Sequence, residues 1–168
     1  MIARLRLSMT RLAGAVLALH LLAFPALALS SGEVERVVHV LEQLAGDLGG
    51  LAYDEEAAEI WFEEDAYAEN RIGAAGFSRE GWQEAADRTL KAYFALMSRA
   101  EIDGLFASFT AMESRGGYSD AQREAARQMA QDMREKISAW RAEGAADASL
   151  VRPFAGRIGA ALQGRTAN

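Results

Sequence analysis

The chain has 168 residues, no cysteine, and 24 acidic against 18 basic side chains, which gives a formal net charge of −6. The absence of cysteine excludes disulfides, thiol chemistry, thiolate metal sites and redox motifs, so packing alone must stabilise the fold. A net acidic chain without a basic stripe does not favour binding to nucleic acid.

The first 28 residues have the three-part pattern of a secretory signal peptide. Three arginines form a basic start, the segment 12–24 is almost wholly apolar, and Ala26 and Ala28 provide small residues before a cleavage site. We therefore expect cleavage after Ala28, export to the periplasm of a Gram-negative bacterium, and a helical domain over residues 29–168. The alternative is an uncleaved membrane anchor, although the apolar run is shorter than the roughly 20 residues of a membrane span.

Charge is distributed unevenly along the predicted helical domain. Residues 29–70 hold 12 acidic side chains and one basic side chain, whereas residues 71–168 hold 12 acidic and 14 basic side chains. This asymmetry leads to two expectations: the acidic segment docks against the more basic remainder of the chain, or it binds a partner with a basic surface.

The spacing of apolar residues predicts helices and gives no support for strands. Apolar residues recur every three or four positions, without the alternating Val/Ile/Thr runs that are typical of strands. Ser30-x-x-Glu33 and Ser119-x-x-Gln122 are capping boxes that mark two helix starts. We expect helices over about 32–48, 54–69, 79–97, 100–114, 119–143 and 150–163, with a loop over 70–77. The predicted fold is all-α: a single compact bundle of five or six amphipathic helices.

The motifs of common enzymes and metal proteins are missing from the sequence. His39, the one histidine of residues 29–168, falls with Glu35 and Glu42 on the polar face of its helix, where we expect ion pairing rather than catalysis. There is no G-x-S-x-G elbow, no H-E-x-x-H helix, no calcium-loop pattern and no Walker lysine. We therefore expect no enzyme activity and no cofactor.

The segment 54–69 holds eight carboxylates and no base. Glu55, Glu59 and Glu63 fall at i, i+4 and i+8 on one stripe of the expected helix, which makes them weak candidates for binding a cation through oxygen ligands. A helix face offers neither the carbonyl ligands nor the tight loop on which calcium affinity depends. A solvated acidic face is the more ordinary interpretation of this stripe.

Four residues are candidates for a partner surface or a ligand groove. On the helical wheel of segment 54–69, Trp61 lies on the apolar face, but Glu64 points into that face and Phe62 points into the acidic one. A buried Glu64 would need a partner or would have a raised pKa. Phe94 falls at the edge of the polar side of the next expected helix, so we expect it, like Phe62, to be exposed.

Residues 82–109 resemble a proteobacterial periplasmic all-helical domain family of unknown function. The resemblance rests on Trp82, Tyr93, Glu101, Ile102, Leu105 and Phe109, which follow the family's spacing of a tryptophan, an aromatic and an E-L-x-x-L-type helix. The chain departs from the family at Ser108-Phe109, where Phe-Tyr is usual, and lacks the Ser-Pro-x-Gly that follows. The resemblance implies an exported helical bundle and supplies no catalytic residues.

These observations lead to three hypotheses. The first is an exported non-enzymatic protein that binds another periplasmic or membrane-associated protein, as an adaptor, a chaperone-like protein or an assembly factor. The second is a module that binds a small ligand or a cation through the acidic and aromatic helix 54–69. The third, an enzyme that uses carboxylates alone, has the weakest support because no pair of carboxylates can be assigned from the sequence.

Overall fold

The computed structural model describes residues 29–114 and 117–164, so the predicted signal peptide lies outside the described residues. All regular elements in these two ranges are helical, which confirms the prediction of an all-α fold. None of the described helices is both long and apolar enough to cross a membrane. The elements are α1 (Ser31–Leu48), α2 (Ala57–Tyr67), α3 (Arg71–Ala74), α4 (Arg79–Leu96), α5 (Arg99–Leu105), α6 (Ala107–Ser114), α7 (Asp120–Gly144), α8 (Ala148–Val151), the 3-10 turn η1 (Arg152–Phe154) and α9 (Ala155–Leu162).

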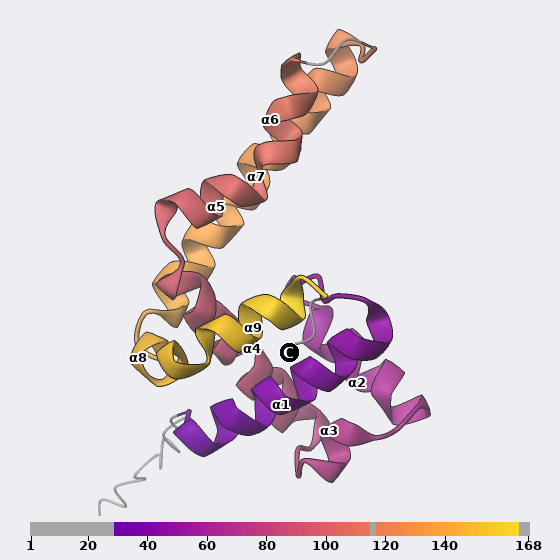
Figure 1. The fold of residues 1–168 in the computed structure, drawn as a ribbon, viewed down its shortest axis with the longest axis vertical. Coiled ribbons are helices and arrows are strands. Elements are labelled where there is room, and N and C mark those ends of the chain that lie inside the picture. The colour runs from indigo at the N-terminus through magenta and orange to yellow at the C-terminus, as the bar shows by residue number, and fades with distance from the viewer. Residues whose placement is uncertain (1–28, 115–116, 165–168) are drawn as a thin grey trace, which may run out of the picture.

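The helices form a body from which a two-layered arm projects (Figure 1). The body contains α1 to α4, α8, α9 and the C-terminal end of α7, which packs against α4. The arm consists of α5 and α6, which run antiparallel to the N-terminal part of α7. A groove at the base of the arm, described below, depends on this arrangement.

Serine caps and one glycine set several helix ends. The predicted capping boxes of α1 and α7 are both present. A third box precedes α5, where the Ser98 side chain accepts from the Glu101 amide and the Glu101 carboxylate accepts from the Ser98 amide. Gly49 ends α1 with a left-handed backbone (φ 73°), a conformation that costs glycine little.

Four expected segments differ from the structure. The helix expected over 100–114 divides at Phe106 into α5 and α6, and the segment 150–163 is interrupted by the 3-10 turn that contains Pro153. The segment expected as a loop contains α3. The helix expected from residue 54 begins at Ala57, because the Asp54 carboxylate accepts a hydrogen bond from the Glu56 amide (3.0 Å) and holds a turn there.

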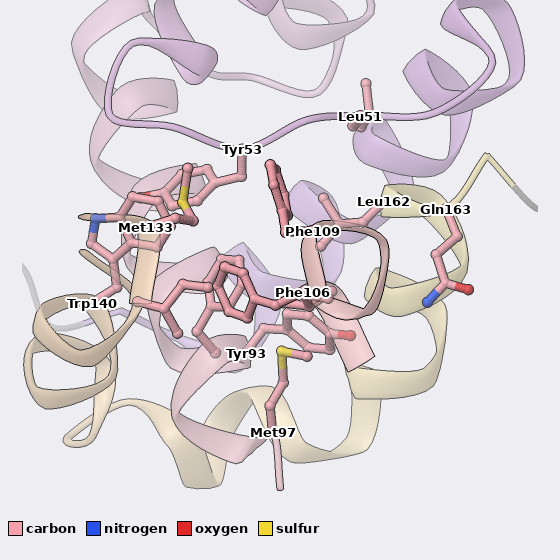
Figure 2. A pocket seen from close by; sticks show the side chains of 13 residues that line it. Leu51, Tyr53, Tyr93, Met97, Phe106, Phe109, Met133, Trp140, Leu162 and Gln163 are labelled. Carbon is pink, nitrogen blue, oxygen red and sulfur yellow. The ribbon is translucent and has the colours of Figure 1, made fainter. Parts of the chain in front are cut away.

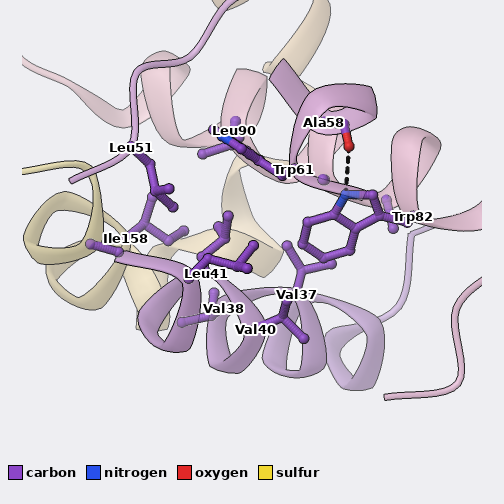
Figure 3. Close-up of a cluster of buried hydrophobic side chains, with 14 of the residues drawn as sticks. Val37, Val38, Val40, Leu41, Leu51, Ala58, Trp61, Trp82, Leu90 and Ile158 are labelled. Carbon is purple, nitrogen blue, oxygen red and sulfur yellow. Dashed lines mark hydrogen bonds between the residues drawn. The ribbon is translucent and has the colours of Figure 1, made fainter. Parts of the chain in front are cut away.

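The main core lies between α1, α2, α4 and α9 (Figure 3). The four valines of α1, together with Leu41 and Leu44, form a buried cluster with Trp61, Trp82 and Ile158. The Trp82 indole N–H donates to the Ala58 carbonyl (2.9 Å), which satisfies its polar atom inside the core and ties α4 to α2.

Ion pairs join the acidic N-terminal segment to the more basic remainder of the chain. Arg71 pairs with Asp47 (2.5 Å), and Arg157 of α9 donates two hydrogen bonds to Glu42 of α1 (2.7 and 2.6 Å). These contacts agree with the expectation that the acidic segment docks within the chain.

The substitution Gly144→Ala should destabilise the fold. A Cβ at Gly144 would lie 2.1 Å from the carbonyl carbon of Lys91, so the crossing of α4 and α7 would have to open. We expect a loss of about 1–3 kcal/mol or more in the free energy of unfolding, measured by urea denaturation. The control Gly46→Ala lies inside α1 with nothing within 4 Å and should stabilise by about 0.5–1 kcal/mol. Equal effects of the two substitutions would contradict this packing argument.

The pair between Glu42 and Arg157 should make stability depend on pH. Hydrogen bonds from Arg157 lower the pKa of Glu42 below its ordinary value. The stability that this pair contributes is therefore fully present above the unfolded pKa, about 4.3, and is lost as the pH falls through the lower folded pKa. We expect Glu42→Gln to reduce the loss of stability on acidification, measured by urea denaturation from pH 6 to pH 3. The variant Glu69→Gln, at an exposed position, should keep the slope of the unaltered protein.

Candidate functional site

An apolar groove of about 270 Å³ lies at the base of the arm (Figure 2). Figure 2 shows aromatic and sulfur-containing side chains that converge on it from the body and from the arm. It is lined by Leu51, Tyr53, Tyr93, Phe94, Met97, Leu105, Phe106, Phe109, Met133, Ile137, Trp140, Leu162 and Gln163.

Three aromatic rings in mutual contact form the body side of this groove. The ring centroid of Tyr53 lies 4.8 Å from that of Trp140 and 5.7 Å from that of Phe94, and Phe94 lies 5.3 Å from Trp140. Tilted and edge-on pairs at these distances are favourable arrangements for aromatic rings. The three rings therefore give the groove a rigid apolar wall.

The arm side of the groove is more adaptable. Phe106 is buried and stacks under Arg134, whose guanidinium carbon lies 4.3 Å from the ring centroid. Phe109, Met97 and Met133 are only half-buried. Methionine side chains are flexible and polarisable, so they can fit apolar ligands of different shapes. The Met97 carbonyl accepts a hydrogen bond from Arg141 (2.9 Å), which fixes the backbone on this side.

An acidic pocket of about 370 Å³ adjoins the groove, and Tyr53 lines both. Five carboxylates line this pocket, together with Lys91 and three other residues; the carboxylates are those of Glu55, Glu56, Glu59, Glu84 and Asp87. The Tyr53 hydroxyl donates to Asp87 (2.5 Å). Lys91 lies between Asp87 (2.9 Å) and Glu143 (2.6 Å), so its charge is already compensated.

The hydroxyl of Tyr53 is held in its neutral form. Burial, and then the hydrogen bond to the Asp87 carboxylate, raise the pKa of Tyr53 far above its ordinary value. Burial lowers the pKa of Lys91, but its hydrogen bonds with Glu143 and Asp87 outweigh that effect and raise it overall, so Lys91 stays protonated. Tyr53 therefore presents an apolar ring to the groove and a fixed hydrogen-bond donor to the acidic side.

Phe94 lines the groove, but the expectation that it is exposed is wrong. Its side chain is only 7% exposed, because Tyr53 and Trp140 pack over it. The helical wheel placed Phe94 at the edge of the polar side of α4, and the connector before α2 and the end of α7 cover that edge. Of the four predicted surface residues, Phe94 is the one that the structure places in the groove.

Trp61, Phe62 and Glu64 lie on α2, outside the residues that line the groove. Trp61 is buried in the main core, and Phe62 is half-buried with the Arg79 guanidinium carbon 5.0 Å from its ring centroid. The expectation that Glu64 points inward is wrong, since Glu64 is exposed. The buried acid is its neighbour Asp65, whose Oδ2 accepts from the Ile72 amide (2.7 Å) and so caps α3.

The stripe of Glu55, Glu59 and Glu63 is not formed as expected. Glu55 lies in the turn before α2, and Arg79 pairs with both Glu59 (3.4 Å) and Glu63. Within 29–114 and 117–164, no three acidic or histidine side chains come together in a way that could hold a metal ion.

Apart from Phe94, no residue of the groove was predicted from the sequence to belong to a site. The residues that were missed as a site are Tyr53, Met97, Phe106, Phe109, Met133 and Trp140. Their aromatic and methionine character is visible in the sequence, but helical spacing does not show that the arm leaves some of them half-buried. No family model, no curated protein and no solved structure matches this chain.

The substitution Tyr53→Phe tests the link between the groove and the acidic pocket. The ring stacking would remain, but the hydrogen bond to Asp87 would be lost. We expect a loss of about 1 kcal/mol in the free energy of unfolding, measured by urea denaturation. Tyr67→Phe removes a hydroxyl from a residue that is 90% exposed and should change stability by less than about 0.5 kcal/mol. A neutral result at Tyr53 would contradict a structural role for its hydroxyl.

Proposed function

We propose that this is an exported, non-enzymatic periplasmic protein that binds an apolar helical segment of another protein in the groove at the base of the arm. Such a protein would act as an adaptor, a chaperone-like protein or an assembly factor. Export is the part of this proposal that rests on the sequence of residues 1–28 alone.

The observation that carries the proposal is the composition of the groove. A rigid wall of Phe94, Tyr53 and Trp140 faces an adaptable side that contains Met97 and Met133. Grooves that accept amphipathic helices are apolar, and methionine is common where one surface binds several sequences. Side chains from the body and the arm line the same groove, so an occupant would contact both parts of the molecule.

A small apolar ligand is the second candidate occupant, because the groove is apolar and only slightly smaller than usual ligand pockets. Its volume of about 270 Å³ lies near the lower limit of ligand pockets, which span about 300 to 1,000 Å³. Peptide length separates the two candidates. A helix-binding groove should bind a peptide of three helical turns more tightly than a peptide of one turn, whereas a small-molecule site should bind both alike.

The substitution Met133→Glu should weaken binding of a labelled, uncharged amphipathic helical peptide, measured by fluorescence anisotropy. A charge in the groove would lose solvation without gaining a partner, and we expect at least about tenfold weaker binding. The control Met129→Glu places the same charge one turn away on α7, where the side chain is 58% exposed. The control should bind like the unaltered protein. Equal losses in both variants, or no loss in either, would contradict the proposal.

A further inference from the structure

We propose that the helical segment bound in the groove is basic and amphipathic: its apolar side chains occupy the groove, and a flanking lysine or arginine enters the acidic pocket beside Tyr53. This inference rests on the proposed function and specifies the chemistry of the partner. The inference rests on the place where the apolar groove and the acidic pocket meet at Tyr53.

The junction is built from a short connector between α1 and α2. Leu51 and Tyr53 line the groove, and Glu55 and Glu56, two or three residues further on, line the acidic pocket. Neighbouring side chains on one face of a helix lie about 5–6 Å apart. In the proposed complex, a helix with an apolar residue against the Tyr53 ring directs a side chain of its next turn toward these carboxylates.

The acidic pocket keeps uncompensated negative charge. No basic side chain among the described residues lies within 4 Å of Glu55 or Glu56. Lys91 does not neutralise them, because Asp87 and Glu143 already hold its ammonium group. A lysine or arginine of a partner could therefore pair with Glu55 or Glu56 without displacing a basic side chain of this chain.

The same charges discriminate between occupants. An acidic segment would meet repulsion from Glu55 and Glu56 beside the groove, and this includes residues 29–70 of a second copy, which hold 12 acids and one base. A simple polycation lacks the apolar face that the groove requires. A basic amphipathic helix satisfies both parts of the junction at once.

Three helical peptides test this inference on the purified protein by fluorescence anisotropy. They share one apolar face and differ at one flanking position, which is lysine, glutamine or glutamate. We expect the lysine peptide to bind about fivefold tighter than the glutamine peptide, the glutamate peptide to bind weakest, and these differences to shrink with added salt. Because the protein is unaltered in this comparison, no variant has to fold. Equal affinities for the three peptides would overturn the inference.

Protein variants then locate the charge effect. The double substitution Glu55→Gln/Glu56→Gln should remove the preference for lysine without changing binding of the glutamine peptide. The matched control, Glu64→Gln/Glu69→Gln, neutralises two exposed acids outside the pocket and should keep the preference. A preference lost equally in both double variants would show a diffuse charge effect and overturn the inference.

Failure of this inference can be distinguished from failure of the proposed function. If Met133→Glu weakens all three peptides but Glu55→Gln/Glu56→Gln leaves the lysine preference intact, the groove binds helices and the basic partner is wrong. If Met133→Glu weakens none of them, the groove is not the binding site and both proposals fall.

Discussion

The close crossing of α4 and α7 is the contact on which the groove depends. Gly144 approaches the Lys91 backbone so closely that a Cβ at this position would lie 2.1 Å from the carbonyl carbon. Arg141 reinforces the crossing through its hydrogen bond to the Met97 carbonyl, at the end of α4. Because α7 is fixed here by its C-terminal turns, its N-terminal turns extend past the end of α4. Among the described elements, only α5 and α6 accompany them, and together these helices form the arm.

This geometry explains why some of the apolar side chains that line the groove stay partly accessible. A two-layered arm can bury one stripe of each helix, whereas a helix within a larger bundle is covered on more sides. At the base of the arm, Phe106 and Ile137 are buried, but Met133 and Phe109 are left half-buried. The accessible apolar surface thus results from the way the arm leaves the body.

Sequence reasoning predicted the helical class and several helix ends, because capping boxes and apolar spacing act locally. It failed where a tertiary contact decided the outcome. On α2 the wheel placed Glu64 inward, but the structure buries Asp65 instead, since this carboxylate can cap α3, seven residues further along the chain. Phe94 had polar neighbours on the wheel and is nevertheless covered by Tyr53 and Trp140, from segments about 40 residues away on either side. Neither contact leaves a signal in local periodicity.

The carboxylates of the N-terminal segment divide into two groups with different surroundings. Glu42, Asp47 and Glu63 pair with arginines that follow residue 70, so their charges hold the body together. Glu55 and Glu56 have no such partner in the described chain and lie beside the apolar groove. Intramolecular docking and the proposed binding of a basic partner are therefore compatible, because they involve different members of one acidic segment. The turn held by Asp54 separates the two groups of carboxylates. Because of this turn α2 begins only at Ala57, and Glu55 and Glu56 lie next to Tyr53, outside the helix.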